Sequence, residues 1–287
     1  MTDDFALLAV IDAYKWWVGN DFGFLQRTEI LDPSGRRTNK TVGLLDLQTF
    51  RDIAAAYSVS RNIPGSPDDA IAAEILKKLS DPEMATYLSG SMHDRKVRLA
   101  EFTKANFVSV VYKESGRSVD RELASALSKI TWFLRPEEWT IFDRYVGVAV
   151  LRRLGSGTAQ MESFYDQLAP KFREVSDGIM IAAAGNGFHP LLANRIIDKY
   201  LFCHGLGMFD KKARKNGVTT DSFVRSSTTA EKLLRPSVET HRRSLLASQL
   251  AMGEHTSGRL HALSKDIEEI LAESCWTDSA RRSSGLS

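Results

Sequence analysis

Apolar residues recur every three or four positions along most of the chain, and this spacing predicts a mainly α protein with many helices. Near the N-terminus, Phe5, Leu8 and Ile11 fall on one face of a helix expected over residues 4–19. The same periodicity predicts helices over residues 44–57, 67–79, 82–88, 94–113, 121–134, 160–175, 177–183, 190–203 and 239–273. The breaks between them are short, so we expect the helices to pack within one body over residues 1–275.

One turn signal interrupts this helical pattern near the N-terminus. The segment Asp32-Pro33-Ser34-Gly35 contains residue types that favour a tight turn. We therefore expect at most a small β-hairpin there, with residues 25–31 paired to residues 38–44.

The helices are predicted to form two lobes that flank a cleft, one from residues 1–20 with 155–275 and the other from residues 44–154. Residues 276–287, rich in Ser and Arg, are expected to be a flexible tail.

Residues 127–155 combine two predicted helices with a short loop. The first helix is expected to end near Leu134, Pro136 opens the loop, and the second helix begins directly after Asp143. Aspartate is a common N-cap, because its carboxylate accepts the free backbone N–H groups of the first turn. The same position also suits catalysis, since a fixed negative charge stabilises a developing cation and orients a water molecule. The aspartate alone does not distinguish these two roles.

The same stretch resembles the C-terminal part of the catalytic core of the helix-hairpin-helix DNA glycosylases. In that family a loop containing proline precedes a catalytic aspartate, which caps a helix of the form Asp-x-x-Val-x-x-x-x-x-x-Arg-Leu-Gly. The matching residues are Asp143, Val146, Arg153, Leu154 and Gly155. The resemblance implies a multi-helix glycosylase-like architecture. It also implies hydrolysis of the glycosidic bond of a base flipped out of double-stranded DNA, with Asp143 as the catalytic carboxylate.

The segment before this stretch departs from the family pattern. Family members often have Leu-Pro-Gly-Val-Gly in the hairpin, whereas residues 114–120 here contain the single glycine Gly116. Such a hairpin binds phosphates through exposed backbone amides, and one glycine weakens that role without abolishing it. The resemblance still implies that Gly116, Arg117, Ser118 and Arg121 contact DNA.

The lysine of the family also differs. Glycosylases that cut the DNA strand carry a nucleophilic lysine further upstream of the aspartate than Lys129, which lies 14 residues before Asp143. Residues 121–124 occupy the place where that lysine is expected, and none of them is a lysine. The resemblance therefore implies a monofunctional enzyme that uses water. Lys129 lies one helix before Asp143, so we expect it to reach the same cleft as a second site residue, although a solvated lysine with a buried stem is the simpler interpretation.

Basic residues cluster at two further places, and each cluster allows two interpretations. Residues 209–215 read FDKKARK and include Lys211, Lys212 and Arg214; the turn near residue 35 is flanked by Arg36, Arg37 and Lys40. A run of charges is usually a solvated face. Beside a DNA cleft it binds phosphates, and the affinity then falls as the salt concentration rises. We include Lys211, Lys212 and Arg214 among the predicted DNA contacts.

Three tryptophans are candidates for holding the flipped base. Trp16, Trp17 and Trp132 lie on predicted helices close to the first lobe boundary or to the candidate site. Stacking on a base requires an exposed aromatic face beside a cleft. Packing in the core is the more common role of tryptophan, and the sequence leaves both roles open.

Composition adds few restrictions. The formal charge of +2 gives no global signal for nucleic acid, so local patches must supply the binding. The two cysteines, Cys203 and Cys275, form no Cys-x-x-Cys pair, and no His-x-x-x-His pair occurs; we expect no metal and no cofactor. The N-terminus lacks the basic region of a secretory signal, and no apolar run matches a bilayer. We expect a cytoplasmic monomer that does not contact a membrane.

The resemblance leaves the substrate and the biological role open. Most of the family repairs oxidised, alkylated or mismatched bases, but some bacterial members excise hypermodified cytosines from bacteriophage DNA, and the divergent hairpin favours the second branch. One alternative is a non-catalytic helical nucleic-acid-binding protein, in which Asp143 only caps a helix. Another is a helical ribonuclease toxin with Arg-x-x-x-x-His on one helix. The nearest pair here, Arg235 and His241, has five intervening residues, Pro236 among them.

Overall fold

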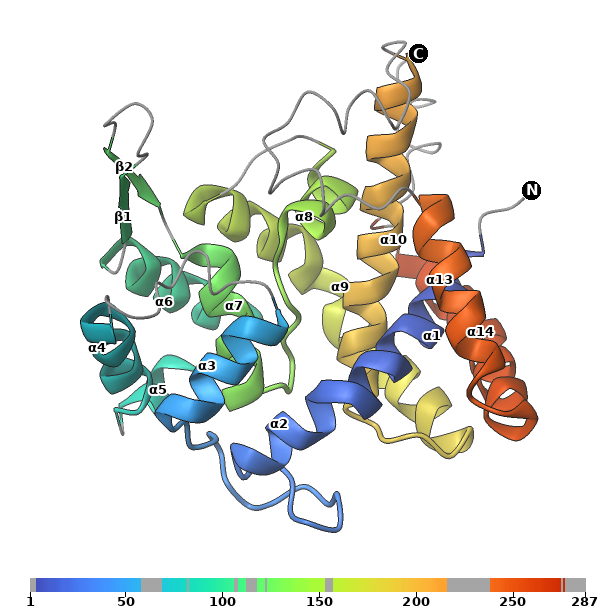
Figure 1. The fold of residues 1–287 in the computed structure, drawn as a ribbon, viewed down its shortest axis with the longest axis horizontal. Coiled ribbons are helices and arrows are strands. Elements are labelled where there is room, and N and C mark those ends of the chain that lie inside the picture. Colours follow the sequence, from blue (N-terminus) through green and yellow to red (C-terminus); the bar gives the residue numbers. More distant parts are fainter. Residues whose placement is uncertain are drawn as a thin grey trace. The chain divides into compact units, whose positions relative to one another are not determined.

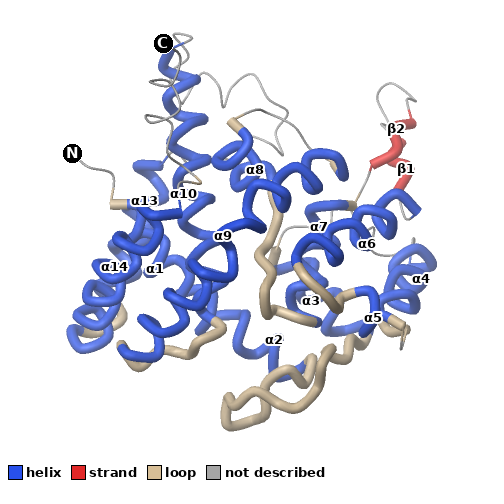
Figure 2. Tube along the Cα trace, turned by 180° about the vertical axis from the view of Figure 1, so that it is seen from behind, coloured by secondary structure: helices blue, strands red, loops and turns tan. Residues whose placement is uncertain are grey.

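The computed structural model describes residues 4–57, 69–81, 83–105, 108–111, 118–121, 123–152, 157–215, 238–274 and 276. Helices dominate this part of the chain (Figures 1 and 2), as the apolar periodicity predicts. Contacts divide the chain into two compact units. Unit 1 consists of Met1–Lys15, Tyr145–Arg153 and Glu174–Ser287. Unit 2 consists of Trp16–Arg144 and Leu154–Arg173.

The first helical run changes its type twice between residues 5 and 27. The α-helix α1 (Phe5–Trp16) leads into a π-helix, η1 (Trp17–Asp21), and this leads into α2 (Phe22–Arg27). Trp16 at the first junction and Asp21 and Phe22 at the second have right-handed helical backbone angles, so the chain does not leave the helix at either junction. Short π-helical turns are rare and often occur at functional sites.

Unit 2 is organised around one buried helix. In addition to η1 and α2, this unit contains α3 (Leu47–Ala56), α4 (Asp69–Leu79), α5 (Met84–Tyr87), α6 (Met92–Ala105) and α7 (Ala124–Leu134). The buried helix is α7. The helix α7 contacts α2, α3 and α6, and α3 and α6 lie beside it in Figures 1 and 2. All its side chains are buried except Ser125 and Lys129. The apolar sequence of α7 therefore forms the core of unit 2.

The last carbonyl groups of α7 are bonded by other elements. Thr28 Oγ1 donates to Phe133 O at 3.1 Å, and Gly43 N–H donates to Leu134 O at 2.8 Å. A Cβ at Gly43 would lie 2.7 Å from Thr28 O, so only glycine allows this approach. The final carbonyls of a helix have no partner within the helix, and these bonds satisfy two of them while fixing where α7 ends.

Between α6 and α7 the structure differs from the predicted helix, turn and helix. The helix expected over residues 94–113 ends at Ala105, and β1 (Val108–Val111) then pairs antiparallel with β2 (Ser118–Arg121). Figure 1 shows the two strands side by side next to α6. The segment Val-Ser-Val-Val of β1 is rich in β-branched side chains, which favour a strand. The next helix also begins at Ala124 and not at residue 121.

The expected N-terminal hairpin is reduced to a single bridge. Leu31 and Arg37 form an isolated antiparallel bridge around the predicted turn. Asp32 stabilises that turn, because its Oδ1 accepts hydrogen bonds from the N–H groups of Ser34 at 2.8 Å and Arg36 at 2.9 Å. The strand expected over residues 25–31 does not form, since α2 extends to Arg27.

The remaining helices are α8 (Arg144–Leu151), α9 (Thr158–Gly185), α10 (Leu192–Lys215), α13 (Val238–Leu250) and α14 (Glu254–Ser274). The helix α9 merges two predicted helices and includes Pro170. The single helix expected over residues 239–273 is broken near Gly253, whose φ is +80°. Within the described ranges no helix is long and apolar enough to cross a membrane.

A buried charged cluster joins three helices of unit 1. Asp12 of α1 lies 3.1 Å from Lys199 Nζ of α10 and 3.4 Å from His241 Nε2 of α13. Burial raises the pKa of the Asp12 carboxyl, but Lys199 and His241 outweigh burial and lower that pKa well below its ordinary value. The carboxylate is therefore held ionised between α1, α10 and α13.

Candidate active site

Asp143 lies where the sequence predicts it, directly before a helix. The helix α7 ends at Leu134, residues 135–143 form a loop, and α8 begins at Arg144. The side chain of Asp143 is half-exposed. The predicted succession of helix, loop and helix is confirmed.

One buried serine joins the two residues predicted to be catalytic. Ser128 Oγ donates to Phe142 O at 3.0 Å and accepts from Phe142 N–H at 3.1 Å. Lys129 follows Ser128 directly, and Asp143 follows Phe142 directly. The two hydrogen bonds therefore hold the backbones of Lys129 and Asp143 next to each other, and both side chains are half-exposed.

The accessible part of α7 is a narrow strip. Only Ser125 and Lys129 are half-exposed along this helix, and they are four residues apart. Residues at this spacing lie on the same helical face, one turn from each other. Lys129 is thus one of two partly exposed residues on a helix that otherwise belongs to the core.

A buried arginine fixes the start of that loop. Arg95 of α6 is 2% exposed, and its Nη2 donates to Thr131 O at 3.0 Å and to Arg135 O at 2.7 Å. Its Nη1 donates to Glu137 O at 3.4 Å, and its guanidinium lies 4.4 Å from the centre of the Trp139 ring. Burial, and then the charge of Arg135, lower the pKa of Arg95 to about 9, so the group remains charged at neutral pH.

The end of the loop packs against the first part of α9. The rings of Trp139 and Tyr165 stack with their centres 3.9 Å apart, and Tyr165 Oη donates to Thr140 O at 2.8 Å. Phe142 contacts Phe164 with ring centres 5.4 Å apart. All these residues belong to unit 2. The backbone that leads to Asp143 is therefore bonded by side chains of both α6 and α9.

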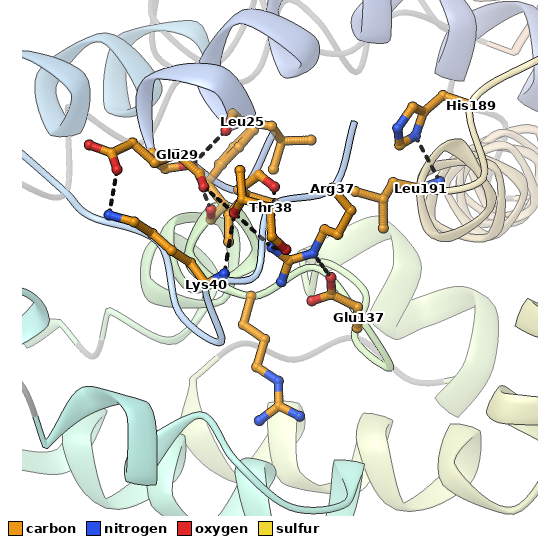
Figure 3. Close-up of polar contacts among 12 residues, drawn as sticks. Leu25, Glu29, Arg37, Thr38, Lys40, Glu137, His189 and Leu191 are labelled. Carbon is orange, nitrogen blue, oxygen red and sulfur yellow. Dashed lines mark hydrogen bonds and ion pairs between the residues drawn. The ribbon is translucent and has the colours of Figure 1, made fainter. Parts of the chain in front are cut away.

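Two basic residues of the N-terminal turn are occupied within unit 2. Arg37 pairs with the Glu137 carboxylate and donates to Ile30 O at 3.1 Å, and Lys40 pairs with Glu29 (Figure 3). Arg37 also supports the loop before Asp143, since Glu137 belongs to that loop. These pairs favour a structural role for Arg37 and Lys40 over the DNA contact considered from the sequence.

The structure separates the three candidate tryptophans. Trp132 is fully buried and packs edge-on against Phe133, with ring centres 4.9 Å apart, and Trp17 is also buried. Neither offers the open face that stacking on a base requires, and this burial favours the core role over the base pocket for both of them. Trp16 is half-exposed and contacts the Tyr57 ring at 4.9 Å. Helical periodicity did not separate Trp16 from Trp17, because the chain turns into a π-helix between them.

The predicted DNA contacts remain predictions. Gly116 and Arg117 lie outside the described residues, and so do Arg153, Leu154 and Gly155 of the family pattern. Ser118 and Arg121 are placed by their backbone at the two ends of β2 and not in a turn between helices. Lys211, Lys212 and Arg214 belong to the last part of α10, where the structure describes the backbone alone.

A cavity of about 690 Å³ in unit 2 does not include the two candidate catalytic residues. Its apolar lining includes Leu45, Leu79 and Met84, and its charged rim holds the cations Arg27 and Lys40 together with the acidic residues Glu29, Asp46 and Asp81. Both of these cations form ion pairs, Arg27 with Asp52 and Lys40 with Glu29. The charge of the rim is thus largely compensated, and we assign no chemistry to this cavity.

Sequence reasoning missed the residues that support the site. Ser128 carried a weak signal, because a serine in the apolar stripe of a helix needs a polar partner when it is buried. Arg95 carried none, since an arginine in the first turn of an amphipathic helix is ordinarily exposed.

Comparisons of the chain with protein-family models, with curated proteins and with solved structures found no match.

Proposed function

We propose that this chain is a monofunctional DNA N-glycosylase, which cleaves the bond between a modified base and its deoxyribose and leaves an abasic site. The observation that supports it most is the pair of hydrogen bonds between Ser128 and Phe142, which hold Lys129 and Asp143 next to each other on a rigid support. The reaction class comes from the resemblance of residues 127–155 to the helix-hairpin-helix glycosylases. The partner is double-stranded DNA that carries a modified or damaged base.

The chemistry assigns a separate task to each of the two side chains. The bond between C1′ and the base nitrogen breaks, its electrons leave with the base, and C1′ gains positive charge. The Asp143 carboxylate stabilises this charge, orients a water molecule toward C1′ and accepts its proton as the new C–O bond forms. The Lys129 ammonium holds a phosphate beside the target nucleotide, because a charged donor binds a phosphate strongly.

The rigid support matters for such a reaction. A carboxylate that must reorganise while charge develops stabilises the transition state less than one that is already in position. Arg95, Tyr165 and Ser128 together bond the backbone of residues 135–142. This fixation fits the proposed role of Asp143 better than a role in capping alone, for which a single hydrogen bond suffices.

The substrate proposed is a hypermodified cytosine in bacteriophage DNA, which would make the protein part of a defence against phage. The test is to incubate the protein with undamaged, oxidised, alkylated and phage-modified DNA. Free base and alkali-labile sites are then measured. We expect both products from the modified DNA only. If DNA is bound but no glycosidic bond is cut in any of the four substrates, the protein is a non-catalytic nucleic-acid-binding protein.

A further inference from the structure

The segment of residues 28–43, which follows α2, bonds the end of α7 from both of its own ends. Thr28 Oγ1 donates to Phe133 O at 3.1 Å, and Gly43 N–H donates to Leu134 O at 2.8 Å. The Thr28 hydroxyl also lies 3.3 Å from a carbonyl of α2, which makes Phe133 O the nearer of its two acceptors. The last two carbonyls of α7 are therefore both held by this segment.

A third contact of the segment reaches the loop that follows α7. Arg37 pairs with the carboxylate of Glu137, which belongs to that loop (Figure 3). The Arg37 guanidinium also donates to Ile30 O at 3.1 Å, and this bond ties it back to the segment. Three contacts thus join the segment to the end of α7 and to the loop that leads to Asp143.

The two ends of the segment approach each other too closely for a side chain at position 43. A Cβ at Gly43 would lie 2.7 Å from Thr28 O and 3.0 Å from the side chain of Ile30. Leu44 N–H donates to the same Thr28 oxygen at 2.9 Å, and Thr28 is fully buried. Because the nearest atom belongs to the backbone, a larger residue fits only if one end of the segment moves. The bond from Gly43 to Leu134 O therefore depends on glycine.

We propose that Thr28 and Gly43 are positioning residues for Asp143, which act through the end of α7 and the loop after it. The inference rests on the proposed function for the role of Asp143 as the catalytic carboxylate. The segment, α7 and the loop all belong to unit 2. A shift of the last turn of α7 changes where the loop starts, and a displacement of about 1 Å at a reacting group can slow a reaction about a hundredfold.

The test compares the rate of base release with the affinity for DNA that carries hypermodified cytosine. The rate is measured under single-turnover conditions, and the affinity in the Asp143→Asn background so that no base is lost. We expect Gly43→Ala to slow release about a hundredfold, because it displaces the backbone. Thr28→Val keeps the shape of the side chain but loses the hydroxyl, and should slow release about tenfold. The affinity should stay nearly unchanged in both variants.

Matched variants separate positioning from a general loss of stability. Thr103→Val removes a fully buried hydroxyl of α6 that bonds its own helix and Thr158 Oγ1. Gly23→Ala adds a methyl group in α2 where no heavy atom would lie within 4 Å. Both should release base at the parental rate. Thr28→Ser keeps the hydroxyl and should retain most of that rate.

A second measurement needs no base release and also covers the case in which Gly43→Ala does not fold. Hydrogen exchange of the backbone amides is followed in residues 135–143. Thr28→Val should raise this exchange about tenfold, because the loop opens more often when its support is weakened. Thr103→Val should leave the exchange of these amides at the parental level.

An unchanged rate of release in Thr28→Val, or an equal loss of rate in Thr28→Val and Thr103→Val, overturns the inference and leaves the proposed function standing. A parent protein that releases no base from any DNA rejects the proposed function. Hydrogen exchange then decides whether Thr28 holds the loop, and equal exchange in Thr28→Val and the parent overturns that as well.

Discussion

Arg95 illustrates how a single buried side chain can determine the path of a loop. Its guanidinium is removed from water, and burial lowers its pKa to about 9. Three backbone carbonyls and the face of Trp139 replace the lost hydration. These carbonyls belong to the end of α7 and to the loop before Asp143, so the contact orders the backbone where the candidate site begins.

Replacing Arg95 by methionine should destabilise the protein strongly. The Arg95→Met variant keeps much of the side-chain volume but leaves buried carbonyls such as Thr131 O without their donor. We expect a loss of about 3 kcal/mol in the free energy of unfolding, measured with urea. Arg36→Met, at an exposed arginine of the same unit, should change it by less than about 0.5 kcal/mol. Equal losses in the two variants would contradict the structural role of Arg95.

Ser128 links stability to the candidate chemistry. The Ser128→Ala variant loses both bonds to Phe142, so the free energy of unfolding should fall by about 1–2 kcal/mol. Base release should fall further than this loss of stability explains, because Asp143 is no longer held beside Lys129. Ser163→Ala is the control, since Ser163 is an exposed serine of α9 that bonds its own helix. An unchanged rate of base release in Ser128→Ala would show that the hydrogen bonds between Ser128 and Phe142 have a structural role only.

At the scale of elements, the boundaries were predictable where the sequence carries a strong local signal. Pro136 and Asp143 limit the loop between α7 and α8, and both boundaries agree with the structure. The end of α6 has no such signal, because residues 104–108 contain neither glycine nor proline. The valines of β1 also fit a helical periodicity, so only pairing with β2 decides their conformation.

The same limit applies to the last two helices. An isolated glycine is tolerated inside a helix, so Gly253 alone did not predict the break between α13 and α14. In the structure Gly253 adopts a positive φ of +80°, which ends the helical path. Pro170 lies inside α9, and the helix predicted over residues 160–175 also included it, although proline ordinarily interrupts a helix.

The docking of α13 on α1 and α10 should depend on pH. The pKa of Asp12 is lowered in the folded protein, so the folded state binds fewer protons than the unfolded chain as the pH falls. The stability that Asp12 contributes is fully present above the ordinary aspartate pKa of about 4 and is lost below it. Urea unfolding at about pH 6 and about pH 3 should show this loss.

The Asp12→Asn variant isolates this contribution. It should be less stable than the parent by about 3 kcal/mol at neutral pH, because Lys199 remains buried without its counter-ion. Its stability should also change less between the two pH values. Asp177→Asn, at an exposed aspartate of α9, should have the same stability as the parent at both pH values. An Asp12→Asn variant with the pH dependence of the parent would contradict the assignment.

At the scale of the whole molecule, the sequence predicted the fold class and the place of the candidate aspartate but not the supporting structure. Asp143 stands out as a candidate because local signals surround it. Ser128, Arg95 and Tyr165 act through contacts with residues 14 to 42 positions away, which periodicity cannot reveal. These four residues and Lys129 all belong to unit 2. The proposed chemistry is thus built by one unit.

The measurement that tests the central proposal most directly is the rate of base release under single-turnover conditions, with DNA that carries hypermodified cytosine. We predict that Asp143→Asn slows release by at least about a hundredfold and leaves DNA affinity nearly unchanged, since the carboxylate acts on the transition state. Asp46→Asn is the matched control, because Asp46 caps α3 of the same unit through Thr49 N–H, and its rate should equal that of the parent. Release by Asp143→Asn at the parental rate, or an equal loss in both variants, would contradict the catalytic role of Asp143.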